Sequence, residues 1–224
     1  PSPLSVTPPT REPLVALMAT VLPPVVSGFP LPSMSRTVMV VVDVSPTAPP
    51  SVVERERKEL LDSNLEATAF WVNWGGEALG EAGAKVFLTA RKAGDLEEAM
   101  AHLQAKGIDA RWVAADMSQP AEVERVATEA LQRLGDIDIL VNNAGATWGA
   151  PTEDYPLEAW DKVMNLNIRS IFLMSQAVGK ASMVPRRQGR IINIASIAGL
   201  SGSIDVKFIA YGTSKGAVVN FTRT

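Results

Sequence analysis

The chain contains no cysteine and only one histidine. Without cysteine it can form neither a disulfide bond nor a thiolate metal site. The single imidazole, His102, argues against a metal cluster, and we interpret it as a solvated residue on a predicted helix. No apolar run suits a membrane helix, because Leu14 to Leu22 is too short and Pro23-Pro24 ends it. We therefore expect no metal site and no membrane partner.

An excess of charge of either sign is also lacking. The chain has 21 Lys and Arg against 24 Asp and Glu, which gives a formal net charge of -3 at pH 7. Such a balance argues against nucleic acid or an anionic membrane as the main partner. The 224 residues suffice for one α/β domain with a good core. We take the cytoplasm as the default compartment.

One short motif carries chemistry. Tyr211 and Lys215 stand four residues apart, which places them on one face of a helix. A lysine ammonium held beside a phenol favours the phenolate, so the tyrosine can act as an acid or a base closer to neutrality. The hydroxyl of Ser196 would hold a substrate oxygen while the proton moves. The combination suits the reduction of a carbonyl or the oxidation of an alcohol. Alone, a Tyr-x-x-x-Lys pair also fits a surface helix with an exposed lysine.

Strands and helices alternate in the hydrophobic pattern. Strands are predicted at residues 85–89, 110–115, 137–142 and 190–195. Helices are predicted to end at Gly107, to begin near Ser118, to run from about Leu157 to Met183, and to carry Tyr211. This alternation predicts an α/β fold with a Rossmann-like, doubly wound parallel sheet. Ligands of such a sheet bind beyond the carboxyl ends of its strands, where Asn143 and Ser196 lie.

Several motifs, in a consistent order, resemble those of the short-chain dehydrogenase/reductase family. They are Asn142-Asn143-Ala144-Gly145 after a strand, Asn167 within Met164 to Arg169, Ser196, Tyr211 with Lys215, and Asp116 at the family's adenine-side position. The resemblance covers residues 76–224, and the local sequence is similar to bacterial 3-oxoacyl-[acyl-carrier-protein] reductases and gluconate 5-dehydrogenases. It implies an NAD(P)-dependent oxidoreductase that transfers hydride between a nicotinamide cofactor and a ketone or secondary alcohol, such as a 3-oxoacyl or sugar substrate.

The resemblance assigns catalysis to four residues. Tyr211 would be the general acid, and Lys215 would assist it and bind the nicotinamide ribose. Ser196 would orient the carbonyl oxygen. Asn167 would hold a water that links Lys215 to solvent; the alternative is a buried helix asparagine bonded to backbone.

Cofactor binding is assigned to a second set of residues. They are Arg91, Asp116, Met117, Asn143, Ala144, Gly145, Tyr211 and Lys215. Asp116 would accept a hydrogen bond from the adenine amino group, or would act as a helix cap. The strand ending in Thr89-Ala90-Arg91-Lys92 offers two cations and no acid. This favours a 2′-phosphate, and so NADP(H) over NAD(H), although both cations also fit a solvated surface.

The glycine-rich turn that binds the pyrophosphate in this family is not recognisable. Counted back from Gly83, its glycines would fall near positions where the chain has Glu66, Phe70 and Val72. Glycines there let the backbone approach the pyrophosphate, so their loss predicts weak cofactor binding. The alternative function is therefore a catalytically inactive, truncated or frame-shifted fragment of such an enzyme.

The two ends of the chain also depart from the family. Residues 1–63 are interpreted as a Pro-rich, unassigned and irregular segment, and residues 64–224 as a partial Rossmann-fold domain that lacks the last strands. Within the first segment, Thr37 to Val44 is a candidate for the first strand, and Val52 to Leu65 for a charged helix. The resemblance also implies a homodimer or homotetramer, formed through the long helices near Asn167 and Tyr211.

Overall fold

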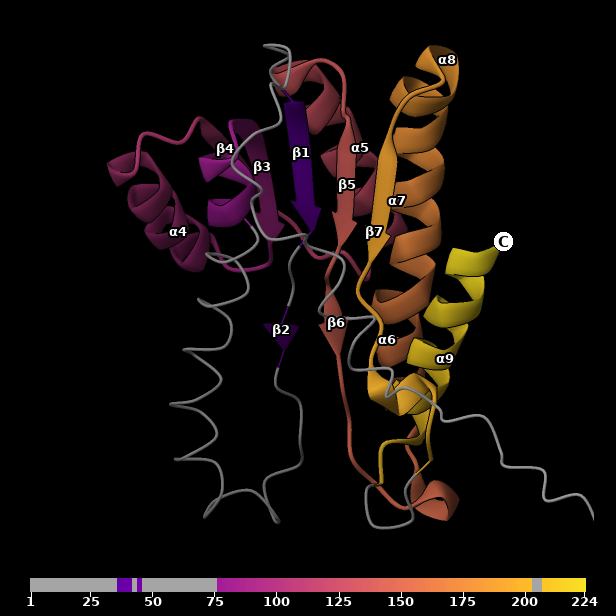
Figure 1. Ribbon diagram of the computed structural model, residues 1–224. Coiled ribbons are helices and arrows are strands. Elements are labelled where there is room, and N and C mark those ends of the chain that lie inside the picture. Colours follow the sequence, from indigo (N-terminus) through magenta and orange to yellow (C-terminus); the bar gives the residue numbers. More distant parts are fainter. Residues whose placement is uncertain (1–35, 42–43, 46–75, 203–206) are drawn as a thin grey trace, which may run out of the picture. The chain divides into compact units, whose positions relative to one another are not determined.

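Five parallel strands form the sheet, in the order β4-β3-β1-β5-β7 (Figure 1). The structure, a computed structural model, describes residues 36–41, 44–45, 76–202 and 207–224, all within the unit Ser35–Thr224. The strands are β1 Arg36–Val41, β3 Ala84–Ala90, β4 Ala110–Ala114, β5 Ile139–Asn142 and β7 Arg190–Asn193. From β1 the chain proceeds to one side of the sheet and then to the other, as in a doubly wound fold. The predicted fold class is confirmed, and among the described residues the sheet ends at β7.

The central strand comes from the N-terminal segment. β1 pairs with β3 through the register Val38↔Val86 and with β5 through Val38↔Ile139. A second short strand, β2 (Val44–Ser45), pairs with β6 (Gly145–Ala146). The predicted first strand is therefore present, close to its expected bounds.

β1 and β2 are regular elements within residues 1–63, the segment interpreted as irregular apart from its candidate strand and helix. Prolines are absent between Pro32 and Pro46, and the β-branched run around Val40 favours an extended backbone. The division of the chain after residue 63 stays a prediction. The suggested helix at 52–65 and the positions of the missing glycine turn lie outside the described residues.

Helices cover both faces of β3. On one face, Val86 and Leu88 pack in a core with Leu96 and Leu103 of α4 (Ala93–Ala105). On the other, Phe87 packs in a core with the buried face of α5 (Pro120–Leu134). Because both faces are covered, the strand reads as one continuous apolar run.

Glycines end two helices, one of them at Gly107 as the sequence predicted. Residues 76–81 are helical, and Gly83 follows them with φ of 87°. Gly107 follows α4 with φ of 73°. Both backbones are left-handed, which glycine adopts without strain.

Two arginines of α5 cover the outer edge of β4. Arg125 donates to the carbonyl of Ala114 at 2.8 Å, and Arg133 donates to that of Trp112 at 2.9 Å. Carbonyls on an edge strand are open to pairing with another chain, and here they are occupied.

The long helix predicted from Leu157 to Met183 has two π-helical interruptions and ends three residues later. Its segments are α6 Leu157–Met164, η2 Asn165–Arg169, α7 Ser170–Val178, η3 Gly179–Met183 and α8 Val184–Arg186. Arg187, with φ of 51°, ends it. The last helix is α9, Ile209–Arg223. No helix within the described ranges combines the length and apolar content that crossing a bilayer requires.

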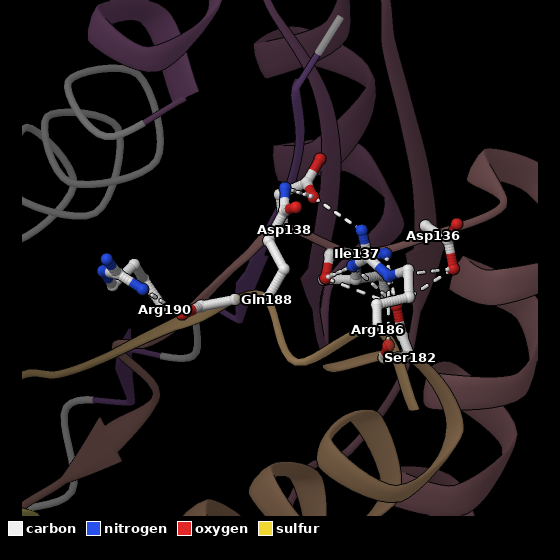
Figure 2. A network of polar contacts seen from close by, with 8 residues as sticks. Asp136, Ile137, Asp138, Ser182, Arg186, Gln188 and Arg190 are labelled. Carbon is white, nitrogen blue, oxygen red and sulfur yellow. Dashed lines mark hydrogen bonds and ion pairs between the residues drawn. The ribbon is translucent and has the colours of Figure 1, made fainter. Parts of the chain in front are cut away.

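Arg186 ties the end of the long helix to the sheet (Figure 2). Its guanidinium donates to Asp138 Oδ1 at 2.9 Å and to the carbonyl of Ile137 at 2.8 Å, and its Nε lies 3.2 Å from Asp136 Oδ1. Ser182 Oγ accepts from the N–H of Ile137 at 2.9 Å. These contacts lie at the amino ends of β5 and β7, opposite the carboxyl ends where the predicted site residues gather.

Candidate active site

Tyr211 and Lys215 lie one turn apart on α9. Lys215 Nζ stands over the Tyr211 ring, 5.7 Å from its centroid, so the ammonium faces the aromatic system. The Lys215 side chain is buried at 4% exposure, and Nζ donates to the carbonyl of Ile194 at 2.7 Å. This burial lowers the pKa of Lys215 to about 8, because a charged group loses hydration there.

Ser196 follows β7 and begins the short 3-10 helix η4 (Ile197–Gly199). Its Oγ accepts from the N–H of Ala198 at 3.2 Å. The hydroxyl proton is then available to donate elsewhere, since a serine hydroxyl can accept and donate together. A loop of this kind holds the hydroxyl at the carboxyl end of the strand.

Glycines bring η4 into contact with α9. A Cβ built on Gly199 would lie 2.5 Å from the carbonyl carbon of Lys215, and one built on Gly212 would lie 3.1 Å from the carbonyl oxygen of Ala198. A Cβ built on Gly216 would lie 3.3 Å from the carbonyl oxygen of Gly199. At Gly199 only a residue without a Cβ allows the two backbones to approach so closely, and this approach sets the Ser196 loop against the helix of Tyr211 and Lys215.

Asn167 lies in the π-helical segment η2 and is fully buried. Its Nδ2 donates to the carbonyl of Ala146 and to Ser214 Oγ, both at 2.9 Å, and its Oδ1 accepts from the N–H of Ala146 at 2.7 Å. The side chain thus joins β6 to α9. These bonds are those of a buried asparagine bonded to backbone, and they use both hydrogens of its amide nitrogen.

The segment after β5 meets Lys215. A Cβ built on Gly145 would lie 3.6 Å from both Lys215 Nζ and Asn167 Oδ1, so glycine leaves that side of the ammonium open. Asn143 is half-buried and Ala144 is buried. Before them, Asn142 donates to Asn193 Oδ1 at 2.8 Å and to Ser175 Oγ at 3.2 Å, which braces β5 against β7 and α7.

Three predicted cofactor residues lie farther along the sheet, after β3 and β4. Asp116 Oδ1 accepts from the N–H and the Oγ of Ser118 at 2.9 and 2.7 Å, which stabilises the turn before α5. The Met117 side chain is buried in the core with Phe87. Arg91 is exposed immediately after β3. The structure therefore shows a local structural role for one oxygen of Asp116 and a core position for the Met117 side chain.

Sequence reasoning missed Ser214 and the three packing glycines. Ser214 is buried, accepts from Asn167, and donates to the Tyr211 carbonyl at 2.7 Å. Its position in the sequence between Tyr211 and Lys215 was the one signal that could have marked Ser214 as part of the site. The glycine pair Gly212 and Gly216, four residues apart on a helix, was a second signal of close packing.

Comparison with known proteins identifies the family of the chain. The profile of the family described as short chain dehydrogenase matches residues 76–224. The chain is 39% identical over 150 residues to the rhamnolipids biosynthesis 3-oxoacyl-[acyl-carrier-protein] reductase of Pseudomonas aeruginosa, covering 66% of this chain and 58% of that protein. It is 37% identical over 149 residues to gluconate 5-dehydrogenase of Gluconobacter oxydans, covering 66% and 56%. The chain thus spans less than two thirds of the length of these relatives.

Solved structures agree with the fold. An actinorhodin polyketide ketoreductase variant with NADPH superposes with a TM-score of 0.67 at 28% identity, covering 84% of this chain and 64% of that one. An NAD+-bound xylitol dehydrogenase gives the same TM-score at 27% identity, covering 85% and 64%. With its parallel sheet and its matching motifs, this chain belongs to the short-chain dehydrogenase family.

Proposed function

We propose that this chain carries the proton-transfer centre of an NADP(H)-dependent reductase of ketones, acting on a 3-oxoacyl, sugar or similar substrate. The observation that carries the proposal is the buried ammonium of Lys215 over the ring of Tyr211, on the helix against which the Ser196 loop packs. A positive charge placed there stabilises a phenolate as it forms.

In the proposed reaction the substrate carbonyl oxygen lies between Ser196 and Tyr211. Ser196 donates its hydroxyl proton to that oxygen as a hydrogen bond and orients it. A reduced nicotinamide, when bound, supplies the hydride to the carbonyl carbon. Tyr211 transfers its phenolic proton to the oxygen, which completes the alcohol, and the phenolate that remains faces Lys215. Reprotonation from solvent restores Tyr211.

The residues present fit the nicotinamide side of such a cofactor. Among the described residues Lys215 donates to the Ile194 carbonyl alone, and an ammonium has two further N–H donors that suit ribose hydroxyls. Gly145 leaves the approach to this ammonium open. Asn143 and Ala144 follow directly after the carboxyl end of β5 and lead to Gly145. In this proposal Asn167 contributes by fixing Ala146, and the water role that the resemblance implied stays a prediction.

The Tyr211→Phe variant tests the reaction, because it removes only the hydroxyl. We expect roughly 10²- to 10⁴-fold slower reduction of acetoacetyl-N-acetylcysteamine with NADPH, as for the loss of a general acid. The same rate in both proteins would overturn the assignment of Tyr211. No activity in either protein would favour the alternative, an inactive fragment, and a titration of indole fluorescence with NADPH then shows whether cofactor still binds.

Cofactor preference is assigned to Arg91. An exposed guanidinium just beyond β3 suits a 2′-phosphate through charge-assisted bonds, and Asp116 is proposed to keep its second oxygen for the adenine. Arg91→Ala is expected to lower the ratio of kcat/KM for NADPH to that for NADH by roughly tenfold. Since similar structures contain NADPH or NAD+, an unchanged ratio would reject the role of Arg91.

Self-association is part of the same proposal. We expect a homodimer or homotetramer through the long helix and α9, and the 47% exposed Phe172 on α7 is consistent with such a surface. Light scattering on the eluting protein would give the mass directly. The cytoplasm stays a prediction from the sequence.

A further inference from the structure

Trp148 carries a buried hydrogen-bond donor without an acceptor among the described residues. It lies in the loop between β6 (Gly145–Ala146) and the 3-10 helix η1 (Thr152–Asp154). Its indole Nε1 is shielded from solvent and unbonded within this part of the chain. An indole N–H can only donate, and a buried donor left unsatisfied costs free energy. A ligand oxygen that accepts this bond would remove that cost.

The loop around Trp148 is fixed on both sides. Its carbonyl accepts from the Tyr155 hydroxyl at 3.2 Å, and the Tyr155 ring meets Trp160 edge-on at 6.4 Å between centroids. The N–H of Ala150 donates to the carbonyl of Lys207 at 3.1 Å. A backbone held in this way presents its side chain to a ligand without a large loss of conformational entropy.

The same loop adjoins the turn of α9 that leads to Tyr211. Gly149 packs on Phe208, since a Cβ at Gly149 would lie 3.1 Å from the ring carbon Cε1. Phe208 precedes Tyr211 by three residues, which is one helical turn. On the other side of Trp148, Ala146 is bonded to Asn167 through both backbone groups. The backbone before Trp148 is thus bonded to Asn167, and the backbone after it packs on Phe208, three residues before Tyr211.

Apolar side chains are exposed next to the other two segments of the site. Ile197 and Leu200, which follow Ser196, are 68% and 49% exposed. Phe208, before Tyr211, is 41% exposed. A hydrocarbon chain can cover such side chains, whereas a polyol would require several hydrogen-bonding groups. These residues and the single donor of Trp148 fit a ligand that is mostly apolar and has one further acceptor oxygen.

We infer that Trp148 is a specificity-determining residue for 3-oxoacyl thioesters, and that its indole N–H donates to the thioester carbonyl oxygen while Ser196 and Tyr211 hold the 3-oxo group. The inference rests on the proposed function, and it selects the acyl substrate over the sugar. A thioester carbonyl accepts and does not donate, which complements a group that only donates. The apolar residues Ile197, Leu200 and Phe208 take up the acyl chain.

Nitrogen-15 NMR of the indole groups tests this contact without turnover. The full chain is labelled at its tryptophans and kept with NADP+, so that no hydride is available, and Trp148→Phe identifies the Trp148 signal. Addition of acetoacetyl-N-acetylcysteamine is expected to move that indole proton downfield, and 2-heptanone, which has one oxygen, is expected to leave it in place. An unmoved signal, or equal movement with both compounds, would overturn the inference. The Trp112→Phe variant, altered on β4, should show the same response as the unchanged chain.

Kinetics separates this inference from the proposed function. Trp148→Phe is expected to lower kcat/KM for acetoacetyl-N-acetylcysteamine roughly tenfold, the effect of one lost hydrogen bond, and to leave that for 2-heptanone unchanged. An equal loss on both substrates would mean that Trp148 only supports the loop, and the inference would fail while the reductase stands. If the unchanged chain reduces neither compound, the proposed function fails, and the indole signal alone decides the contact.

Discussion

Gly199 lies directly against the backbone of Lys215. A Cβ on Gly199 would come within 2.6 Å of both the carbonyl oxygen of Lys215 and the N–H nitrogen of Gly216. Gly199 ends η4, which Ser196 begins, so this contact joins the serine loop to the helix of the tyrosine and the lysine. The relative position of the three proposed catalytic side chains depends on the absence of one methyl group.

Gly199→Ala is therefore expected to displace η4 from α9. The methyl group meets backbone atoms that cannot move aside, and overpacking of this kind costs about 1–3 kcal/mol of unfolding free energy. Ser196 moves with the loop, so the free-energy barrier to carbonyl reduction should rise by more than the free energy of unfolding falls. Urea unfolding and kcat measure the two effects.

Gly216→Ala is the matched control for this variant. Its methyl group would lie 3.3 Å from the Gly199 carbonyl, and alanine favours a helix over glycine by about 1 kcal/mol. These effects oppose each other, so we expect a nearly unchanged stability. Equal losses in the two variants would show that the contact at Gly199 is not special.

The sequence was sufficient for the elements that periodicity and local chemistry determine. Buried parallel strands read as apolar runs, as at Phe87 and Leu88, and a glycine such as Gly107 ends a helix by taking the left-handed conformation. The pairing of Tyr211 with Lys215 follows from helical spacing alone. These features depend on neighbours close in sequence, and they were predicted.

The features that were missed depend on distant partners. Asn167 bonds to Ala146, a residue 21 positions away, and the π-helical segment around it leaves no mark in the hydrophobic pattern. To predict that Gly199 packs on Lys215, one must know the positions of two backbone segments together. The segment of β1 was named as a candidate for the first strand, but its partners could not be read from the hydrophobic pattern, because its strand pairs connect segments more than 40 residues apart.

Lys215→Met is expected to stabilise the fold while it abolishes reduction. Burial lowers the pKa of Lys215 to about 8 from an ordinary 10.5, so the unfolded chain binds this proton more tightly than the folded chain. The folded state is thus penalised below pH 8, by up to about 3 kcal/mol, and the penalty disappears as the pH rises from 8 to 10.5. Methionine removes the charge and keeps the length.

Urea unfolding at pH 7 and at pH 10 measures this linkage. The unchanged chain should gain stability between the two values through Lys215, and Lys215→Met should lack that gain. Lys162, exposed on α6, provides the control, since Lys162→Met removes the same charge from a position that is in contact with solvent. If Lys215→Met is less stable than the unchanged chain at pH 7, the bond to Ile194 outweighs the cost of burial.

Carbonyl reduction is expected to decline as the pH rises through about 8. Above that value Lys215 loses its proton, and with it the charge that faces the forming phenolate of Tyr211. A profile of kcat/KM from pH 6 to pH 10 measures the decline, with Tyr211→Phe as the background rate. A rate that rises steadily to pH 10 would contradict the role given to the Lys215 ammonium.

Arg186 is expected to contribute to stability and little to chemistry, because its contacts lie at the far end of the strands (Figure 2). Arg186→Ala removes a guanidinium donor from Asp138 and from the Ile137 carbonyl in a half-buried setting, which costs about 1–3 kcal/mol. Arg190→Ala is the control, since within the described part of the chain its guanidinium donates only to the adjacent Gly189 carbonyl, in an exposed position. Urea midpoints should fall for the first variant alone. The KM for NADPH should match in both, because the helix end is distant from Tyr211, and a raised KM in Arg186→Ala would show that this contact also positions the site.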